Sequence, residues 1–363
     1  MSTSKRKIEH LKLCSSSPVE SRFKNSGFDD ISLVHRALPE MDMNEIDHSV
    51  SFFGKKLKTP FLIASITGGH PDTTAINAAL AEAVEETGVG IGVGSQRAAI
   101  EDPEQESSFT IVRDKAPTSF IYGNIGAAQI REYGIEAMEK MIEVIDADAF
   151  AIHLNFLQEA IQPEGDVNAT GVIDSISEIC ELDIPIIVKE TGCGISYEDA
   201  ILLKKAGVSA IDVGGVGGTS WAGVEVYRAN TQSTDSYRQN VGELFWDFGI
   251  PTVASIVECD VSLPIIATGG VRSGLDVAKS ISLGASVASS ALPFIEPAFK
   301  GSQFVTKKIE QIIEELKISM FLTGCKNISQ LKKSPLTVTG WTKEYLAQRG
   351  FDTSYFALKP DVL

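Results

Sequence analysis

Polar side chains recur where short apolar runs of this chain end. The run at 61–65 is followed by Thr67, Gly68 and Gly69, the run at 89–94 by Ser95, Gln96 and Arg97, and the runs at 119–124 and 184–190 carry Asn124 and Lys189. Hydroxyl, amide and ammonium groups bind a small polar ligand when the fold brings them to one edge. A glycine turn and a solvated rim explain any single motif equally well. The recurrence at four run ends favours one shared site.

The segment AIHLNFLQEAIQPEGD (151–166) holds a second group of polar side chains. His153 and Asn155 alternate onto one face of an extended run, and Gln158 and Glu159 follow in the connection. Glu159 is a candidate ligand for Mg²⁺, which keeps several waters and takes one or two protein carboxylates. A lone loop carboxylate is usually just solvated, and a lone histidine is usually a hydrogen-bonded structural residue. The segment alone leaves both interpretations open.

Glycine-rich turns follow the last two apolar runs. The first turn contains Gly269, Gly270, Val271 and Arg272, and the second ends with Ala291 and Leu292. Glycines let backbone N–H groups approach phosphate oxygens, and the positive ends of the following helices favour a dianion. Gly-Gly pairs also make plain turns. The place of these turns at the end of the repeated pattern favours phosphate binding.

Lys189 lies at the end of a predicted buried strand, in the run 184–190. An ammonium group in such a place is costly to desolvate unless an anionic partner lies near it. That partner is either a carboxylate in a core salt bridge or the N1–C2=O edge of a flavin.

A basic face lies near the amino end of the chain. In the stretch KRKIEH, Arg6, Lys7 and His10 fall within about 100° of helical arc, whereas Ile8 and Leu11 face the other side. A solvated stripe on a terminal helix explains this segment taken alone. The chain has a formal net charge of -16, however, so clustered cations stand against an adverse field. We therefore predict a second phosphate clamp, made by charge-assisted hydrogen bonds.

Eight short, β-branched apolar runs must position these groups. They lie at 61–65, 89–94, 119–124, 149–155, 184–190, 210–215, 264–270 and 286–291. Continuous apolarity is typical of strands covered on both faces, and the stretches between the runs carry apolar residues at helical spacing. The pattern predicts an α/β fold, a (β/α)8 TIM barrel with an N-terminal extension, and an open doubly wound sheet is the alternative. In a barrel the reactive groups sit at the carboxyl ends of the strands.

The interval after the sixth run is longer than the others. Residues 215–250 form a polar, glycine-rich connection, which we predict to be an active-site lid that ends where Pro251 opens the next helix. The lid contributes Thr219, Trp221, Glu225 and Arg228. Trp221 is predicted to cover a cofactor ring or an apolar substrate tail, although burial is an equally common role for tryptophan.

Composition and length bound the class of protein. The 363 residues are 43% hydrophobic, which excludes disorder as the main theme, and the acidic charge makes nucleic acid and anionic membranes poor partners. Five widely spaced cysteines indicate neither a disulfide framework nor a thiolate metal site. With no signal segment and no long apolar window, the chain is predicted to be cytoplasmic. We expect an extension over 1–60 made of a short helix and extended segments that cap the barrel bottom, a barrel over 61–324 whose last helix ends at Gly324, and a tail over 325–363.

Taken together, the motifs resemble those of the type 2 isopentenyl diphosphate isomerases. The resemblance rests on RKIEH, the first TGG, GSQR, HLNFLQE, VKETGCGIS, GGTSW followed by Glu225, and GGVRSG with SSALP, in that order over nearly the whole chain. It implies an FMN-containing (β/α)8 barrel that interconverts isopentenyl and dimethylallyl diphosphate. It also implies Mg²⁺, reduced flavin supplied through NADPH or NADH, and a homotetramer or homo-octamer.

The resemblance assigns roles to individual residues. FMN would be held by Thr67, Gly68, Gly69, Ser95, Asn124, Lys189, Thr219, Gly269, Gly270, Val271, Arg272, Ala291 and Leu292. Substrate diphosphate would meet Arg6, Lys7, His10, Ser95, Gln96, Arg97, His153 and Asn155. Gln158 would lie beside the reacting carbons as both a binding and a catalytic residue, with Glu225 and Trp221 as further catalytic candidates, and Glu159 would bind Mg²⁺.

The chemistry implied by the resemblance suits these residues. Moving a double bond requires protonation of a weakly basic alkene and loss of an allylic proton, and the sequence offers few strong acids near the site. A reduced flavin can exchange the proton at N5 and stabilise developing positive charge. The alternative is an FMN-dependent 2-hydroxy acid oxidase or dehydrogenase on the same barrel, but such enzymes place a His base after strand 6, where this chain has GGVGGTSW. A non-catalytic barrel, the other alternative, would purify without the yellow colour of FMN.

Overall fold

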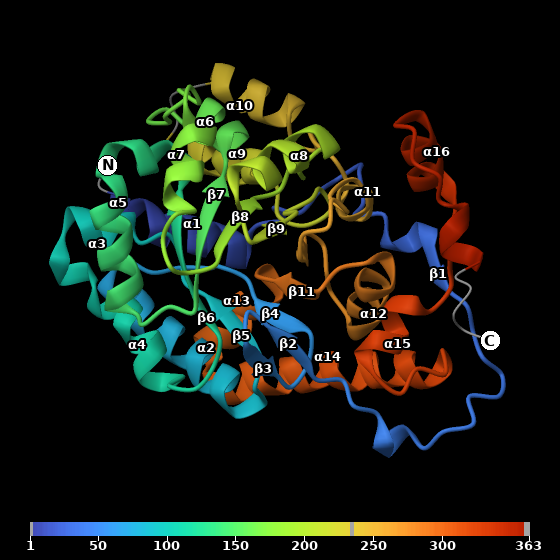
Figure 1. Ribbon diagram of the computed structural model, residues 1–363. Coiled ribbons are helices and arrows are strands. Elements are labelled where there is room, and N and C mark those ends of the chain that lie inside the picture. The colour runs from blue at the N-terminus through green and yellow to red at the C-terminus, as the bar shows by residue number, and fades with distance from the viewer. Residues whose placement is uncertain (1–2, 233–235, 359–363) are drawn as a thin grey trace.

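A closed barrel of eight parallel strands forms the centre of the molecule (Figure 1). The computed structural model describes residues 3–232 and 236–358, without the side chains of residues 3–6, 230–232 and 236. In chain order the barrel strands are β4 (Phe61–Ile63), β5 (Gly90–Gly92), β6 (Ile121–Gly126), β7 (Ala149–Leu154), β8 (Ile186–Glu190), β9 (Ala210–Asp212), β10 (Ile265–Thr268) and β11 (Val287–Ser290). Pairing of β11 with β4 closes the barrel. Each predicted run overlaps one strand, so the barrel is confirmed and the open sheet is excluded.

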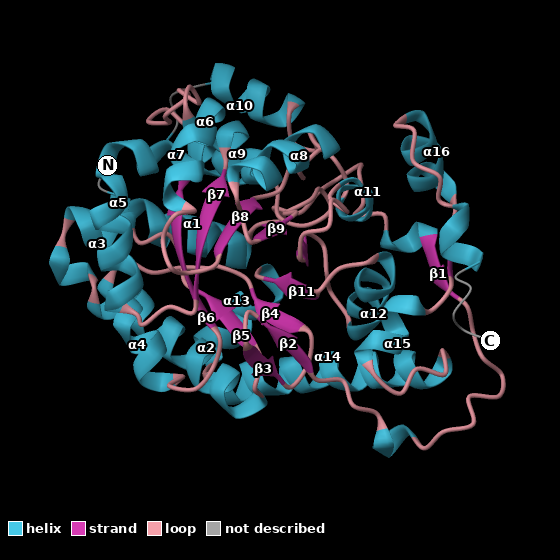
Figure 2. Ribbon diagram, viewed as in Figure 1, coloured by secondary structure: helices cyan, strands magenta, loops and turns pink. Residues whose placement is uncertain are grey.

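Helices surround the barrel between successive strands (Figure 2). They are α2 (Thr74–Thr87), α3 (Arg97–Glu101), α4 (Ser107–Lys115), α5 (Ala127–Val144), α6 (Phe156–Ile161), α7 (Val172–Ile179), α8 (Tyr197–Ala206), α9 (Trp221–Gln232), α10 (Ser236–Leu244), α11 (Thr252–Glu258), α12 (Gly274–Leu283), α13 (Leu292–Lys300) and α14 (Ser302–Leu322). Capping residues fix several helix ends. At the start of α12, for example, Ser273 and Asp276 form a capping box. α14 ends just before Gly324, as predicted.

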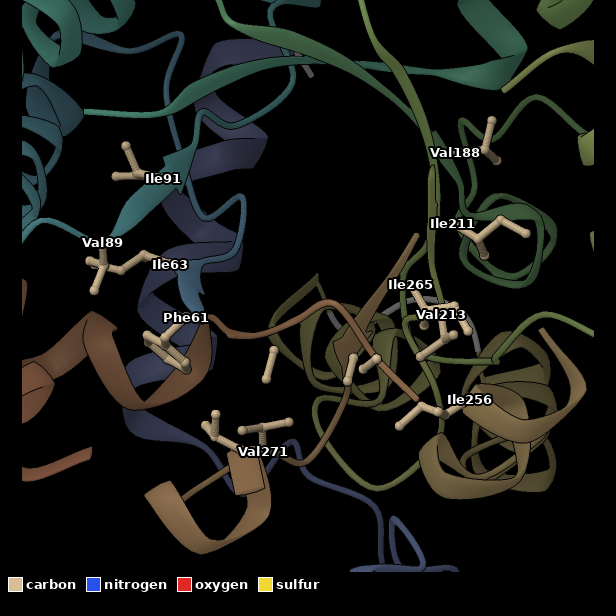
Figure 3. Packing of buried hydrophobic residues seen from close by; sticks show 14 of the residues in the cluster. Phe61, Ile63, Val89, Ile91, Val188, Ile211, Val213, Ile256, Ile265 and Val271 are labelled. Carbon is tan, nitrogen blue, oxygen red and sulfur yellow. The ribbon is translucent and has the colours of Figure 1, made fainter. Parts of the chain in front are cut away.

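Two apolar clusters pack the barrel. The larger lies between the strands and the outer helices, and Figure 3 shows part of it, including Phe61, Ile63 and Ile256. The smaller lies inside the barrel and includes Leu62 and Tyr122. Because the strands are covered on both faces, their sequences read as continuous apolar runs.

A hairpin from the N-terminal extension caps the inner cluster. Strands β2 (Val50–Phe52) and β3 (Lys55–Leu57) pair antiparallel and bring Phe52 and Leu57 against Phe120, which directly precedes β6. The ring centres of Phe52 and Phe120 are 5.4 Å apart. The hairpin therefore covers the amino end of the barrel, as the sequence predicts.

The two flanks of the chain meet beside the barrel. The remaining elements are α1 (Thr3–Ser16), β1 (Ile31–Leu33), α15 (Ile328–Lys333), β12 (Leu336–Val338) and α16 (Gly340–Gln348). β1 pairs antiparallel with β12, and Figure 1 shows β1 and α16 on the same side of the molecule. The division into 1–60, 61–324 and 325–363 stays a prediction. Among the helices that the structure describes, none has the length and apolar character needed to cross a membrane.

The connection between β9 and β10, predicted as a polar and glycine-rich lid, contains helices that the sequence analysis did not identify. Residues 215–250 contain the helices α9 and α10. The inward face of α9 carries the buried charged pair Glu225 and Arg228, so the apolar spacing that normally reveals a helix is interrupted. A Cβ atom at Gly223 would overlap the ring of Trp246, which shows how closely α9 packs. Pro251 stands directly before α11, in agreement with the prediction.

Candidate active site

A cavity of about 250 Å³ opens at the carboxyl ends of the barrel strands. Residues from the ends of all eight strands or the loops that follow them line it, and α1 adds Lys7, His10, Leu11 and Cys14. Barrel enzymes carry their active sites at this end of the strands. The cavity is therefore the candidate active site.

Most of the side chains predicted for the site line this cavity. The structure brings together Lys7, His10, Thr67, Ser95, Arg97, Asn124, His153, Asn155, Gln158, Glu159, Lys189, Thr219, Trp221, Gly269, Gly270, Arg272, Ala291 and Leu292. It places Gly68, Gly69, Gln96, Val271 and Glu225 behind the lining. The side chain of Arg6 lies outside the described residues, so its place stays a prediction.

Gln96 supports the cavity wall from behind. Its side chain is fully buried, Nε2 donates to the carbonyl of Met141 at 2.9 Å, and Oε1 accepts from the N–H of Asn124 at 3.2 Å. Both ends of the amide are therefore bonded to the backbone. The structure directs Gln96 to the strand end beside it, whereas its neighbours Ser95 and Arg97 reach the cavity.

Gly69 makes room for a cation. Its φ of 85° is in the left-handed region, and a Cβ atom there would lie 2.8 Å from Lys7 Nζ and 2.5 Å from Ala98 Cβ. A side chain at Gly69 would displace the ammonium group of Lys7. Gly68 belongs to the same turn as Gly69 and lies against the ring of Phe109 on α4.

Helix α1 turns its basic face into the cavity. Lys7 Nζ donates to the carbonyl of Ser95 and lies 5.2 Å from the ring centre of Phe109. His10 meets Trp221 edge to face, with ring centres 5.3 Å apart. Lys7 and His10, the two side chains of the predicted clamp that the structure describes, therefore both line the cavity.

His153 is a neutral imidazole in the cavity wall. Asn124 Nδ2 donates to the carbonyl of Val93 at 3.3 Å, so Asn124 Oδ1 is the atom that accepts from His153 Nδ1 at 3.0 Å. This assigns the proton to Nδ1. Burial, followed by the charges of Lys189 and Lys7, lowers the pKa of His153 to about 3. Nε2 is then an acceptor near neutral pH.

A chain of hydrogen bonds joins Asn155 to the start of α6. Asn155 Nδ2 donates to Gln158 Oε1 at 3.3 Å and to Glu159 Oε1 at 2.9 Å. Glu159 Oε2 accepts from Gln162 Nε2 at 2.5 Å and from the N–H of Asp166 at 2.8 Å. The sequence places Glu159 in a loop, but it belongs to α6 and is buried, so its carboxylate is held rigidly at the cavity wall.

Glu225 lies behind Gln158 and holds it. Gln158 Nε2 donates to Glu225 Oε1 at 3.1 Å, and His10 Nε2 lies 2.9 Å from the same oxygen. Burial alone would raise the pKa of Glu225, but His10, Gln158 and the charge of Arg228 together lower it to about 2. Glu225 is therefore ionised at neutral pH and does not touch the cavity itself.

The glycine turn after β10 differs in one respect from the predicted phosphate site. The N–H groups of Arg272 and Ser273 donate to Asp276, and the N–H of Gly274 donates to Glu315. The start of α12 is thus bonded to carboxylates. Backbone donors for a phosphate are expected from Gly269, Gly270 and the start of α13 instead.

Two buried carboxylates beside Lys189 were missed by the sequence reasoning. Asp212 lies opposite Lys189 in the strand register, and burial raises its pKa against the charge of Lys189. Glu190 Oε2 accepts from the N–H groups of Thr191 and Gly192, each at 2.6 Å, and from that of Cys193. Their signal was available, since Asp212 and Glu190 are charged residues within the predicted apolar runs 210–215 and 184–190, as Lys189 is.

Other cavity residues were not predicted from the sequence. Ser65, Gln129, Gln162, Thr191 and Thr268 line the cavity beside the predicted residues. Gln129 lies in α5 and Gln162 directly follows α6, beyond the strand ends, where position relative to the motifs does not reveal them.

Comparison with known proteins decides the family. A family model described as FMN-dependent dehydrogenase matches residues 2–113 and 135–338. An isopentenyl-diphosphate delta-isomerase of Methanococcoides burtonii is 66% identical over 363 residues, which is 100% of each chain. A protein of the same name from Methanosarcina barkeri is 67% identical over 360 residues, 99% of this chain and 98% of the relative. This chain belongs to the isopentenyl-diphosphate delta-isomerase family.

Membership of the isomerase family agrees with the predicted isomerase, flavoprotein and barrel. Among solved structures, a lactate oxidase of Pediococcus acidilactici aligns with a TM-score of 0.66 and covers 92% of this chain and 95% of its own. The two sequences are 17% identical, so this likeness shows the fold alone.

Proposed function

We propose that this chain interconverts isopentenyl diphosphate and dimethylallyl diphosphate through acid–base chemistry with reduced FMN. The observation that carries the proposal is the amide of Gln158, held at the cavity wall between Asn155 and Glu225. An amide does not titrate near neutrality, so it orients a reacting group without taking its proton. A double-bond shift involves no net oxidation, and a cofactor can serve as its acid and base.

The residues on the cavity floor fit FMN. Among the residues that the structure describes, Thr67 Oγ1 is buried without a hydrogen-bond partner, and Lys189 lines the cavity. We assign Lys189 to the flavin N1–C2=O edge and the turn at Gly269 and Gly270 to the phosphate. When bound, reduced FMN supplies a proton donor and acceptor at N5 and an electron-rich ring. The other assigned FMN residues are Gly68, Gly69, Ser95, Asn124, Thr219, Val271, Arg272, Ala291 and Leu292.

The clamp on α1 faces the other polar wall of the cavity and suits a diphosphate. Lys7 lies against the carbonyl of Ser95, and Arg97 lines the same wall. Charge-assisted hydrogen bonds from these groups would hold the substrate tail. Arg6, His10, Gln96, His153 and Asn155 complete the set assigned from the sequence, with Gln96 acting from behind the lining.

Glu159 would hold the magnesium ion that the reaction uses. Mg²⁺ typically takes one or two protein carboxylates and completes its shell with water and substrate phosphate. Glu159 lines the cavity, and no cluster of three or more metal-ligating side chains occurs among residues 3–232 and 236–358. Glu159 would supply one such carboxylate, in the same cavity as Lys7 and Arg97.

Three residues would act on the hydrocarbon end of the substrate. Gln158 would orient the alkene for reaction with the flavin, and Glu225 holds Gln158 through its Oε1 atom. Trp221 lines the cavity next to His10 and would exclude water from the reacting carbons.

An FMN-dependent 2-hydroxy acid oxidase is the alternative on this fold. Its base is a histidine after the sixth barrel strand, which is β9 here. The chain has five histidines and none follows position 153. Proton abstraction from a 2-hydroxy acid by that route is therefore not open to this protein.

Further properties extend the proposal. We assign NADPH as the reductant of the flavin, a homotetramer or homo-octamer as the assembly, and the cytoplasm as the location. These assignments rest on the resemblance and on the composition of the chain.

One anaerobic experiment tests the proposed reaction. The FMN-loaded protein is reduced with a single equivalent of dithionite, freed of NADPH, and given excess isopentenyl diphosphate and Mg²⁺ in deuterated water. Many equivalents of deuterated dimethylallyl diphosphate should form while the spectrum of reduced flavin persists. Turnover that stops after one equivalent, or flavin that oxidises in step with product, would contradict the proposal. Gln158→Ala should slow this turnover, because the alkene loses its positioning contact.

A further inference from the structure

Arg228 on α9 gathers carboxylates from three separate segments. Its guanidinium group is buried, and Nη1 donates to Glu225 Oε2 at 2.9 Å. Nη2 donates to Glu164 in the connection between α6 and α7, and Nε lies 3.5 Å from Glu9 Oε2 on α1. One cation therefore ties α9 to the wall that carries Gln158 and to the helix that carries the clamp.

The charges around Arg228 explain why α1 depends on this arginine for its position over α9. Glu9, Glu164 and Glu225 converge on a single buried guanidinium, and like charges at such a distance repel when no cation lies between them. Burial lowers the pKa of Arg228, but Glu164 and Glu225 more than offset that effect and raise it. Without Arg228, docking of α1 over α9 would place these carboxylates together unopposed.

The same contacts set the orientation of Glu225. Arg228 holds Glu225 Oε2, which leaves Oε1 for Gln158 at 3.1 Å and His10 at 2.9 Å. Gln158 in turn accepts from Asn155. The position of the amide in the cavity wall therefore depends on a guanidinium that does not line the cavity.

We propose that Arg228 is a positioning residue of the reaction, which aligns Glu225 with Gln158 and holds the clamp helix α1 closed. The first role rests on the proposed isomerisation, and the second does not. Arginine suits both roles because its planar fork presents donors in several directions, whereas lysine offers one compact charge.

Kinetics of the FMN-loaded enzyme test the first role. Arg228→Gln should lower kcat at least tenfold, raise the KM for isopentenyl diphosphate, and leave FMN affinity unchanged. Arg228→Lys should recover part of kcat, because a point charge can still hold Glu225. Glu9→Gln, which loosens α1 alone, should raise KM with little change in kcat.

A matched control removes a similar arginine elsewhere. Arg113 is also largely buried and bonds to Asp148 and to carbonyls at the amino end of the barrel, including that of Ser119. Arg113→Gln should lower the stability of the protein and leave kcat and KM unchanged. A loss of kcat common to both variants would overturn the proposal, because it would come from general loosening of the fold.

A double-mutant cycle with Glu225→Gln tests whether Arg228 affects kcat through Glu225. If Arg228 acts through Glu225, the double variant should be about as slow as Glu225→Gln alone. Losses that multiply, or an Arg228→Gln enzyme with unchanged kcat, would overturn the positioning role.

Hydrogen exchange tests the second role without the reaction. In the FMN-loaded protein without substrate, the amides of α1 should exchange at least tenfold faster in Arg228→Gln than in the wild type. Unchanged exchange rates over α1 would overturn the proposal that Arg228 holds this helix in place. This measurement needs no turnover. If the wild type did not isomerise its substrate, the proposed function would be refuted, and the role of Arg228 in holding α1 could still be tested by hydrogen exchange.

Discussion

The free energy of unfolding of the wild type should fall as the pH rises through the pKa of Glu190, and Glu190→Gln should abolish this fall. Burial raises the pKa of Glu190 from 4.5 to about 7, in spite of the N–H donors of Thr191, Gly192 and Cys193. Between these values the folded protein keeps a proton that the unfolded chain has released, so the free energy of unfolding falls with pH. The shift corresponds to about 3 kcal/mol in full, and to about 2.5 kcal/mol between pH values of about 5 and 8.

Urea unfolding of both FMN-saturated proteins across this pH range measures the effect. Glutamine keeps an oxygen acceptor for the three N–H groups, and titration of the other residues cancels in the difference between the two proteins. The advantage of Glu190→Gln should therefore grow by about 2.5 kcal/mol toward high pH. A constant difference would refute the reasoning, because it would mean that burial does not hold a proton on this carboxylate.

Glu85→Gln is the control for this measurement. Burial would raise the pKa of Glu85, but hydrogen bonds from Thr118 and Ser119 lower it below its usual value. Its stabilising effect is complete above the unfolded pKa and is lost only in more acidic solution. The difference between wild type and Glu85→Gln should therefore stay flat over the same range.

Three further predictions concern the ligands. Lys7→Ala should raise the KM for isopentenyl diphosphate about tenfold, because a charge-assisted hydrogen bond is lost, and unaltered kinetics at full flavin content would exclude the clamp. Gly270→Val should weaken FMN binding at least tenfold in a fluorescence titration, since a Cβ atom there would lie 2.5 Å from the carbonyl of Gly217. Gly284→Val, at another positive φ but in open space, should bind FMN normally, and equal affinity in both variants would contradict the assignment. Burial and two lysine charges hold the pKa of His153 near 3, so an arriving diphosphate should raise it and draw a proton from solution near neutral pH. Calorimetry in buffers of different ionisation enthalpy should show this uptake in the wild type and not in His153→Gln, and heats independent of the buffer would refute it.

The strands and the site edge could be predicted because burial on both faces leaves a plain mark in the sequence. Runs such as 184–190 are continuously apolar until Lys189, and the carboxyl ends of parallel strands share one edge. The polar run ends therefore pointed to one cavity before its geometry was known.

The sequence did not show which of the predicted side chains reach the cavity and which lie behind its lining. Ser95, Gln96 and Arg97 are consecutive, yet only the amide of Gln96 turns toward the backbone of β6, because the chain bends into α3 at that point. Helix α9 was missed because the buried ion pair of Glu225 and Arg228 interrupts the buried apolar residues Ala222, Val224 and Val226. Charged residues at buried positions obscure the apolar spacing of the helix, and only their partners on α1 and α6 show why they are buried.

The pairing of β1 with β12 bears on the order in which the protein is made. Ile31 lies opposite Val338, so the ribosome must add more than 300 residues before this strand finds its partner. The barrel strands between them can pair with neighbours as they emerge, because each meets the one before it. The amino-terminal flank must wait with an open backbone edge, which is a template for contacts with other chains. The open edge of β1 is therefore covered only when β12, the last strand of the chain, has been made.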